Sequence, residues 1–417
     1  MWRTLKFMGV IALIVIAHIL WTRHASQSTP GDENAPASDA ATTTPAPSTA
    51  PASVTQLPAS WPTYRGDAAM TGVCQGRIGT NFTPAWRFKT GDKVLSSPVI
   101  DGWRVFIGSG DGNVYCISLA SGHQMWAYKT DGAVTAPPLL VGDSVIVGSE
   151  DGNIYCLKAS NGSVRWSHPT HSKVVAAANS YTAKDGRVCV VVGSWDYNLY
   201  SLDLQSGRPE WTIRTANYVN GPCAVEGGRG VFGGCDTNIY TVDLQAGRMV
   251  RQVSTGSPIP SAVALRDGKG YVGNYGQPNS PAGANGGEFF IMDLASGELG
   301  PPNRFEGPFL APPAVSDKYI VLATGNMEAG HVHCITHDGT SVWDVATDDA
   351  IESGPLIIGD KVLVGGNDKY LRLLSMKDGK SLWTYRLGGA IKSSPAAAAG
   401  YAVVGCSDGY VYAFKAE

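Results

Sequence analysis

Short runs of apolar residues alternate with turn residues along most of the chain, and the same order of runs returns about every forty residues. In residues 96–126 a segment of small residues precedes a valine-rich run, an Asp-Gly turn, a run containing tyrosine, a Ser-Gly turn and a tryptophan-bearing run. Short β-prone runs joined by tight glycine-containing turns are typical of antiparallel strands. Each repeat therefore predicts one four-stranded antiparallel sheet.

Two independent series of residues count the repeats. Tryptophan occupies one position in six of them, and degenerate copies near Arg251 and Arg304 complete that series. A small-residue turn before the third strand, with aspartate in most repeats, also occurs eight times. Eight such sheets in a ring bury both faces of every sheet. The sequence therefore predicts an all-β fold, an eight-bladed β-propeller of four-stranded antiparallel blades. The tryptophans, interpreted as structural core residues, are Trp86, Trp126, Trp166, Trp211, Trp343 and Trp383.

The two ends of the repeat region predict how the ring closes. The sequence finishes on the third strand of a repeat, residues 410–414, whereas residues 84–88 form a lone tryptophan-bearing strand ahead of the first complete repeat. We expect this N-terminal strand to complete the last blade. Truncation at about residue 90 is then expected to destabilise the ring far more than deletion of the segment ahead of it.

The first sixty residues predict export and a tether. Arg3 and Lys6 precede an apolar run over residues 7–21, which is typical of an export segment. Because a cleavage site is only approximated, residues 1–24 are interpreted as an uncleaved signal anchor in preference to a cleaved signal peptide, and both alternatives stay open. Residues 25–60, rich in Pro, Ala, Ser and Thr, predict a disordered linker. The propeller, residues 61–417, is thus expected in the cell envelope, periplasmic or extracytoplasmic, on a membrane anchor.

Charge narrows the class of partner. The formal net charge is −3, and beyond the extreme N-terminus no run of Lys and Arg gives the positive surface that nucleic-acid phosphates require. We therefore exclude nucleic acid and expect an exported or membrane protein as the partner of a monomeric propeller.

The eight cysteines do not predict a disulfide framework. Cys116, Cys156 and Cys334 hold equivalent places in their repeats, which favours small core residues. Cys223 and Cys235 flank a glycine-rich turn and could face each other across a hairpin, so a disulfide between them stays open.

The repeat motif and the segment ahead of the first blade resemble those of a known protein family. The repeat Asp-Gly-x-Val/Ile-Tyr followed by Gly-x-x-x-Trp, together with the motif Trp61-Pro62-x-x-Arg65-Gly66-Asp67, resembles the pyrroloquinoline-quinone-like β-propeller repeat proteins over about residues 61–417. The resemblance implies the fold strongly and the function weakly, since members include quinone-dependent dehydrogenases as well as non-catalytic propellers. One of the latter is the propeller lipoprotein of outer-membrane β-barrel assembly.

Two functions follow from this resemblance. The dehydrogenase alternative, acting on alcohols or sugars, would need pyrroloquinoline quinone with Ca²⁺, and such enzymes are typically larger and carry adjacent cysteines beside the quinone. This chain has no Cys-Cys pair, and its 40-residue repeats leave no material for a lid. We expect no cofactor, no catalytic residue and no resident metal, and interpret the protein as a non-catalytic envelope scaffold that binds another protein, with outer-membrane or envelope protein assembly as one example of its role.

Candidate contact residues fall at the start of the innermost strands and in irregular turns. Glu352 and Lys392 hold equivalent places in adjacent blades and are placed to pair. Loops that depart from a repeat often carry its binding face, and the expanded turn over residues 273–287 is the most irregular stretch. The residues predicted to contact a ligand or partner are Lys93, Lys173, Asn220, Tyr275, Gln277, Asn279, His331, Glu352 and Lys392.

Two groups of candidate metal ligands have a simpler interpretation. The turn aspartates Asp111, Asp151, Asp196, Asp236, Asp368 and Asp408 are spread round the ring, and aspartate tightens turns by accepting hydrogen bonds from its own backbone. His331 and His333 alternate on one strand face with His337 near by, so a metal site is conceivable there. Ordinary polar strand residues are the favoured interpretation.

Overall fold

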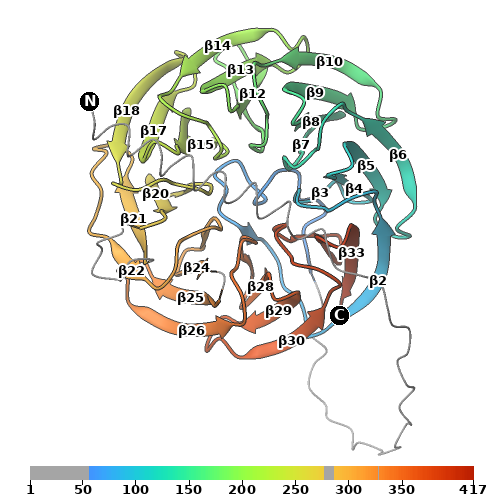
Figure 1. The fold of residues 1–417 in the computed structure, drawn as a ribbon, viewed down its shortest axis with the longest axis vertical. Coiled ribbons are helices and arrows are strands. Elements are labelled where there is room, and N and C mark those ends of the chain that lie inside the picture. The colour runs from blue at the N-terminus through green and yellow to red at the C-terminus, as the bar shows by residue number, and fades with distance from the viewer. Residues whose placement is uncertain (1–55, 277–285, 327) are drawn as a thin grey trace, which may run out of the picture. The chain divides into compact units, whose positions relative to one another are not determined.

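The computed structural model describes residues 56–276, 286–326 and 328–417, and these form eight sheets arranged radially around one axis (Figure 1). Each sheet contains four antiparallel strands, as predicted, and one sheet gains a short fifth strand, β1 (Val73–Cys74), in parallel at its inner edge. We number the blades 1 to 8 from the one that begins with β3. Within the described residues no helix has the length and apolar character of a membrane span. The predicted export segment, residues 1–24, and linker, residues 25–60, lie outside the described residues up to position 55.

The strands form four concentric layers. The innermost strands are β3 (Val99–Ile100), β7 (Leu139–Val141), β11 (Asn179–Thr182), β15 (Ala224–Glu226), β19 (Ala264–Arg266), β23 (Ala314–Val315), β27 (Leu356–Ile358) and β31 (Ala396–Ala398). The second strands are β4 (Arg104–Gly108), β8 (Ser144–Gly148), β12 (Val188–Gly193), β16 (Arg229–Gly233), β20 (Lys269–Gly273), β24 (Tyr319–Gly325), β28 (Lys361–Gly365) and β32 (Tyr401–Gly405). The third strands are β5 (Asn113–Ser118), β9 (Asn153–Lys158), β13 (Asn198–Asp203), β17 (Asn238–Asp243), β21 (Gly287–Asp293), β25 (Gly330–Thr336), β29 (Tyr370–Ser375) and β33 (Tyr410–Ala416). The outer strands are β6 (Gln124–Lys129), β10 (Val164–Pro169), β14 (Pro209–Arg214), β18 (Arg248–Ser254), β22 (Asn303–Phe305), β26 (Ser341–Thr347), β30 (Ser381–Arg386) and β2 (Phe82–Lys89).

The turn aspartates hold the hairpins between second and third strands. In blade 1, Asp111 accepts hydrogen bonds from the Asn113 amide at 2.9 Å, from the Gly91 amide at 2.6 Å and from the Tyr115 hydroxyl at 2.7 Å. Burial alone would raise the pKa of Asp111, but these hydrogen bonds outweigh it and lower the pKa. The predicted structural role is therefore confirmed. Tyrosine hydroxyls bond the equivalent aspartates at 2.9 Å (Tyr155 to Asp151), 2.6 Å (Tyr200 to Asp196), 2.5 Å (Tyr240 to Asp236) and 2.6 Å (Tyr412 to Asp408).

The tryptophan series joins neighbouring blades. The Nε1 of Trp126 donates to the Ala159 carbonyl of the next blade at 3.0 Å, and its ring covers Gly162, which has a φ of 73°. A Cβ on Gly162 would lie 2.6 Å from the Trp126 ring, so the turn requires glycine for both its conformation and its clearance. The same Trp-to-carbonyl bonds are made by Trp86, Trp166, Trp211 and Trp343.

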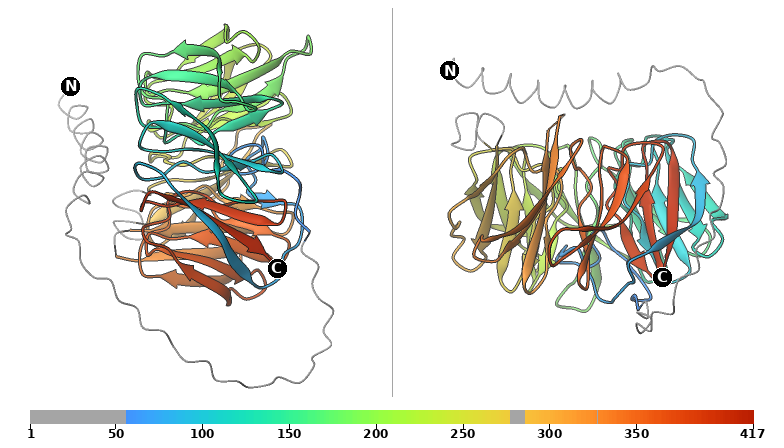
Figure 2. Two further views of the ribbon diagram at one scale, coloured as in Figure 1. Left: turned by 90° about the vertical axis from the view of Figure 1, so that its right-hand side faces the viewer. Right: turned by 90° about the horizontal axis from the view of Figure 1, so that it is seen from below.

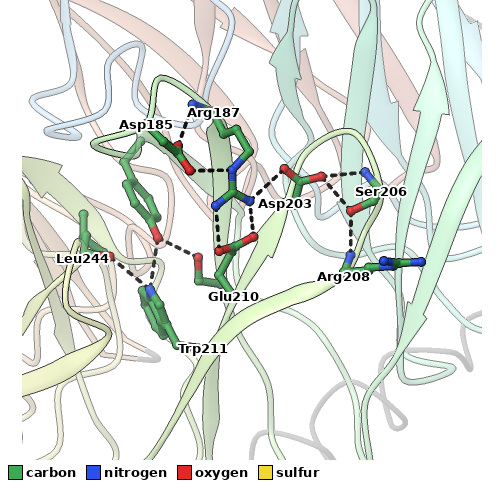
Figure 3. A network of polar contacts seen from close by, with 10 residues as sticks. Asp185, Arg187, Asp203, Ser206, Arg208, Glu210, Trp211 and Leu244 are labelled. Carbon is green, nitrogen blue, oxygen red and sulfur yellow. Dashed lines mark hydrogen bonds and ion pairs between the residues drawn. The ribbon is translucent and has the colours of Figure 1, made fainter.

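A polar network on blade 3 surrounds one of these joints (Figure 3). The guanidinium of Arg187 contacts Asp185 at 2.7 Å, Asp203 at 3.5 Å and Glu210, which ties the β11–β12 turn to the third strand β13 and the outer strand β14. The Arg187 side chain is 47% exposed, and exposed ion pairs contribute little to the stability of a fold. We therefore regard this network as a strand connection and not as a site.

The ring closes as predicted. Strand β2 pairs antiparallel with β33 from Phe82 opposite Ala416 to Lys89 opposite Tyr410, so the N-terminal strand is the outer strand of blade 8. In Figure 2 the blue N-terminal strand lies beside the red C-terminal strands. The blade that contains both ends of the propeller is thus held by main-chain hydrogen bonds.

A second N-terminal feature was not predicted. Residues 58–74, which we call the plug, cross one end of the central channel. Their carbonyls accept amide hydrogens from seven blades, six times from the innermost strand and once from the residue directly after it. In blade 3 the Asn179 side-chain amide donates to the Ala68 carbonyl instead, at 2.7 Å. β1 (Val73–Cys74) ends the plug and pairs in parallel with β27. The amide donors are Ile100, Leu140, Val225, Leu265, Val315, Ile357 and Ala399.

Several side chains of the plug are buried. Arg65 is 1% exposed, and its Nη2 donates to the carbonyls of Pro313 at 3.1 Å and Pro355 at 2.5 Å. Burial lowers the pKa of Arg65 to about 10. Met70 is fully buried between blades 4 and 5. The plug is therefore part of the folded core and closes one end of the channel.

The cysteines are all free thiols. Cys116, Cys156 and Cys334 are buried as predicted, and burial raises the pKa of the Cys116 thiol to about 12. The disulfide left open between Cys223 and Cys235 is not formed. Cys223 points into the core between blades 3 and 4, whereas the Cys235 sulfur accepts a hydrogen bond from Asn220 at 3.4 Å at the channel, so the two do not face each other.

Candidate functional site: the axial channel

Among the described residues, no segment like the plug crosses the other end of the axial channel. The turns between second and third strands surround this end, and we call this side of the propeller the mouth face and the other the plug face. Inside lies a cavity of about 170 Å³. Its wall comes from the segments that lead into the innermost strands, and Tyr64 of the plug also lines it. The channel is therefore a blind pocket.

Two levels of residues form the wall. At the upper level, equivalent positions of the eight blades carry Leu95, Thr135, Val175, Asn220, Pro260, Leu310, Glu352 and Lys392. At the lower level, nearer the plug, small residues narrow the channel, namely Ser97, Pro137, Ala177, Pro222, Ala262 and Pro312. Three of the predicted contact residues, Asn220, Glu352 and Lys392, thus line one cavity.

The two charged residues of the upper level neutralise each other. The Lys392 ammonium lies 2.7 Å from a Glu352 carboxylate oxygen, as the sequence positions indicated, and Asn367 Nδ2 donates to the same carboxylate at 3.0 Å. Burial lowers the pKa of Lys392, and Glu352 acts in the opposite direction. Blades 7 and 8 therefore present the channel with a paired, locally neutral group.

Lys173 and Lys93 lie outside the cavity lining. The Lys173 ammonium is 2.5 Å from Glu150 of blade 2 and 5.6 Å from the centre of the Trp195 ring. The Lys93 charge is close enough to act on Lys392, lowering the pKa of that ammonium. These lysines belong to the rim of the mouth face, where Lys173 makes an ion pair between blades.

A third level, at the rim, was missed by the sequence analysis. It consists of the residue that precedes the turn aspartate, or its equivalent, and includes Glu150, Trp195, Cys235, Tyr275, Asn367 and Ser407. In the sequence, these residues share only their position in the repeat, directly before the turn aspartate, because no residue type is preferred there. Tyr275, the one member predicted from its irregular turn, is partly buried, and this burial raises its pKa to about 12. Gln277 and Asn279 lie outside the described residues.

His331 is not brought to the cavity. The Nδ1 atoms of His331 and His333 lie 2.7 Å and 3.0 Å from the two carboxylate oxygens of Asp344 on the outer strand β26. His337 lies apart, with Nε2 2.9 Å from the Ser316 carbonyl oxygen. Among the described residues no group of three or more His, Cys, Asp or Glu side chains could hold a metal ion. The favoured interpretation, polar strand residues, agrees with these contacts.

Comparison with known proteins agrees with the fold. A family model described as outer membrane protein assembly factor BamB matches residues 81–217, 136–267 and 282–417. A search of curated proteins found no match.

Solved structures match the propeller at low identity. BamB from Moraxella catarrhalis is 18% identical with a TM-score of 0.63, covering 80% of this chain and 98% of that one. A europium-containing methanol dehydrogenase is 13% identical with a TM-score of 0.71, covering 85% and 98%. The quinohemoprotein alcohol dehydrogenase from Comamonas testosteroni is 14% identical with a TM-score of 0.71, covering 85% and 80%. At these identities the structures establish the fold alone.

Proposed function

Because the chain belongs to the family described as outer membrane protein assembly factor BamB, we propose that it is a non-catalytic scaffold of the cell envelope. It binds an exported or outer-membrane protein and contributes to the assembly of such proteins. The family match, which extends over most of the propeller, is the observation that carries this proposal. The predicted membrane anchor and the periplasmic location belong to the same proposal.

The mouth face is the better of the two faces for a partner. The plug face is occupied by residues 58–74, whose main-chain groups are bonded to the innermost strands. The mouth face carries the described ends of the least regular turns, residues 273–276, 286–287, 325–326 and 328–330, and a rim of mixed charges that includes Lys93, Glu150 and Lys173. Paired rim charges select a partner by complementarity more than they add affinity.

The residues of the cavity argue against the dehydrogenase alternative. A volume of about 170 Å³ is below the roughly 300–1,000 Å³ of pockets that bury a drug-sized ligand, and pyrroloquinoline quinone is a ligand of that class. Ca²⁺ takes about six to eight oxygen ligands, whereas the one carboxylate among the lining residues, Glu352, is engaged by Lys392 and Asn367. We therefore propose no quinone and no calcium ion for this channel.

The test combines capture and reconstitution of the full chain. Chemical cross-linking in intact cells, followed by capture of the tagged protein, is expected to yield one stoichiometric partner that is itself exported. Purified protein mixed with pyrroloquinoline quinone and Ca²⁺ is expected to give no bound chromophore. Reduction of an electron-accepting dye with alcohols or sugars would overturn the proposal.

A further inference from the structure

The joint between blades 7 and 8 differs from the regular joints. Between blades 1 and 2, the turn from the third to the outer strand places Gly162 under the ring of Trp126. Blade 8 has no such turn, because its third strand β33 and its outer strand β2 come from opposite ends of the propeller. Trp383, the equivalent tryptophan, packs instead on Phe82 and Phe414, with ring centres 5.3 Å and 5.4 Å apart. Ring closure therefore gives this joint a packing of its own.

A tyrosine of the same joint also has a different partner. Between blades 1 and 2, Tyr128 packs on Tyr155 with ring centres 5.5 Å apart. Tyr385 is the equivalent of Tyr128, yet it packs on Phe414 at 5.1 Å. The ring of Tyr412, the equivalent of Tyr155, lines a groove of about 800 Å³ together with Tyr385. The groove thus lies where the regular contact between the two tyrosines is replaced.

This groove, which we call the closure groove, runs along β33 between the outer strands β30 and β2 (Figure 1). From Tyr410 to Phe414 its floor extends about 13 Å, at about 3.3 Å per residue. The opposite wall includes Tyr385, and the lining near Phe414 is apolar, with Pro84 and Ala85. The length of the floor matches an extended segment of about five residues, whereas a small aromatic acid would fill only part of it.

The end of the closure groove near the mouth face is positively charged. The Arg87 guanidinium and the Lys89 ammonium lie 5.0 Å and 4.4 Å from the centre of the Tyr410 ring. Both side chains are exposed, and within the described residues neither forms an ion pair with a carboxylate. Asp408, the one carboxylate among the lining residues, accepts the Tyr412 hydroxyl at 2.6 Å and the Tyr410 amide at 3.0 Å. The charge available to a ligand at this end is therefore cationic.

The register of the sheet fixes the spacing between the charged and the apolar parts. Arg87 lies opposite Tyr412, two residues before Phe414 on β33. Side chains on one face of an extended chain also recur every two residues. We infer that the closure groove binds an extended acidic segment of another protein, with a carboxylate at Arg87 and an apolar side chain against Phe414 and Tyr385. This inference goes beyond the proposed function, because the closure groove and the mouth face are separate surfaces.

Calorimetry and ligand-observed NMR on the full chain test the closure groove with synthetic peptides. The probes are the acetylated and amidated peptide Asp-Ser-Asp-Ser-Phe and its reverse sequence, because the groove accepts either chain direction. Controls carry lysine in place of both aspartates or serine in place of phenylalanine, and phenylpropionate serves as a small aromatic acid. We expect saturable binding of at least one acidic probe with a Kd of about 0.1–1 mM, and binding of its lysine version weaker by about tenfold or more.

Three results would overturn the inference. The first is the absence of saturable binding of either acidic probe at several millimolar. The second is equal binding of the acidic and the lysine peptides, which would contradict the role of the cations. The third is binding of phenylpropionate as tight as that of the acidic probes, which would assign the closure groove to a small aromatic acid in place of an extended segment.

Variants with matched controls locate the binding. Arg87→Glu is expected to weaken binding of the acidic probe about fivefold and to narrow its advantage over the lysine peptide. Arg214→Glu is the control, because Arg214 lies over the Tyr197 ring at 5.7 Å in blade 3, and it should leave binding unchanged. Equal binding by the two variants would contradict the inference.

The aromatic wall has its own pair of variants. Tyr385→Ala is expected to weaken binding of the acidic probe about threefold or more, because it removes a ring that contacts the apolar side chain. Tyr128→Ala, at the same repeat position in blade 1, should leave binding unchanged. Equal effects of the two tyrosine variants would place the peptide elsewhere and contradict the inference. If Tyr385→Ala does not fold, Arg87→Glu still decides the test, because the Arg87 side chain is exposed.

Discussion

Met70 gives the sharpest test of the plug, because this side chain lies outside every blade and is nevertheless fully buried. It packs against residues of blades 4 and 5, among them Val231, Val263 and Leu265. The preceding carbonyl, that of Ala69, accepts the Leu265 amide at 2.8 Å, which fixes the side chain in place. Replacing a buried methionine by alanine costs about 2–5 kcal/mol, so Met70→Ala is expected to lower the free energy of unfolding by that amount.

Two further variants make the result specific. Met125→Ala, on the outer strand of blade 1 where the side chain is 42% exposed, is expected to change the free energy of unfolding by less than about 0.5 kcal/mol. Met70 has a φ of 59°, in the left-handed region that favours glycine. Met70→Gly is therefore expected to be no less stable than Met70→Ala, although glycine is ordinarily the worse residue.

Urea unfolding followed by tryptophan fluorescence measures all three variants. Equal stability of Met70→Ala and Met125→Ala would refute the conclusion that the plug is part of the core. A Met70→Gly variant clearly less stable than Met70→Ala would refute the backbone conformation on which the argument depends.

Three further predictions follow from the structure. Trp126→Ala removes a nearly buried ring and its hydrogen bond to the next blade, so urea unfolding should show a free energy of unfolding lower by about 3–5 kcal/mol. Trp103, which is 56% exposed, is the control, and Trp103→Ala should change the free energy of unfolding by less than about 0.5 kcal/mol. Similar losses in the two variants would contradict the role of Trp126 in joining the blades. Hydrogen bonds from His333 and His331 lower the pKa of Asp344 to about 2, below the ordinary value of about 3.9. The ionised Asp344 carboxylate therefore stabilises the fold above about pH 4, and this stabilisation is lost as the pH falls through about 2. A carboxyl NMR titration of Asp344 with a midpoint near the ordinary value would contradict this, and Asp344→Asn should lack that part of the acid dependence. Alkylation of denatured, unreduced protein should label both Cys223 and Cys235, and mass spectrometry that finds them linked would contradict their separation.

The repeat made the fold predictable. Strand order, blade number and closure follow from positions such as Trp126 and Asp111, because each of these residues acts within one blade or on the next, and the period repeats the same contacts. The fold could therefore be predicted from local interactions, because an aspartate that tightens a turn, or a glycine packed under a tryptophan, makes the same contacts in each repeat that contains it.

The plug could not be predicted in this way. The motif Trp61 to Asp67 was visible, but its role depends on contacts with residues far away in sequence, such as Arg65 with Pro313 and Pro355. A segment without periodic apolar positions gives no indication of which surface it covers. Asp67 contributes only locally, accepting the Thr71 amide at 2.9 Å.

The candidate site was predicted in part for the same reason. Asn220, Glu352 and Lys392 line the cavity because they hold one repeat position, and Lys173 is at the rim because it stands two residues earlier in its repeat. The rim residues that precede the turn aspartates have no common side chain, so only their position in three dimensions revealed them. His331, chosen from its irregular turn, lies away from the cavity because it contacts Asp344 on the neighbouring strand, and its contact with a partner stays a prediction.

Site-specific photo-cross-linking in the intact envelope tests the central claim most directly. A photoreactive residue replaces Asp131 or Asp348, both exposed on the mouth face, or Asp143 or Asp267 at turns on the plug face. We predict cross-links to one exported protein from the two mouth-face positions and none from the plug-face positions. Cross-links confined to the plug face, or none from either face in cells that retain the full chain, would contradict a scaffold that binds its partner through the mouth of the propeller.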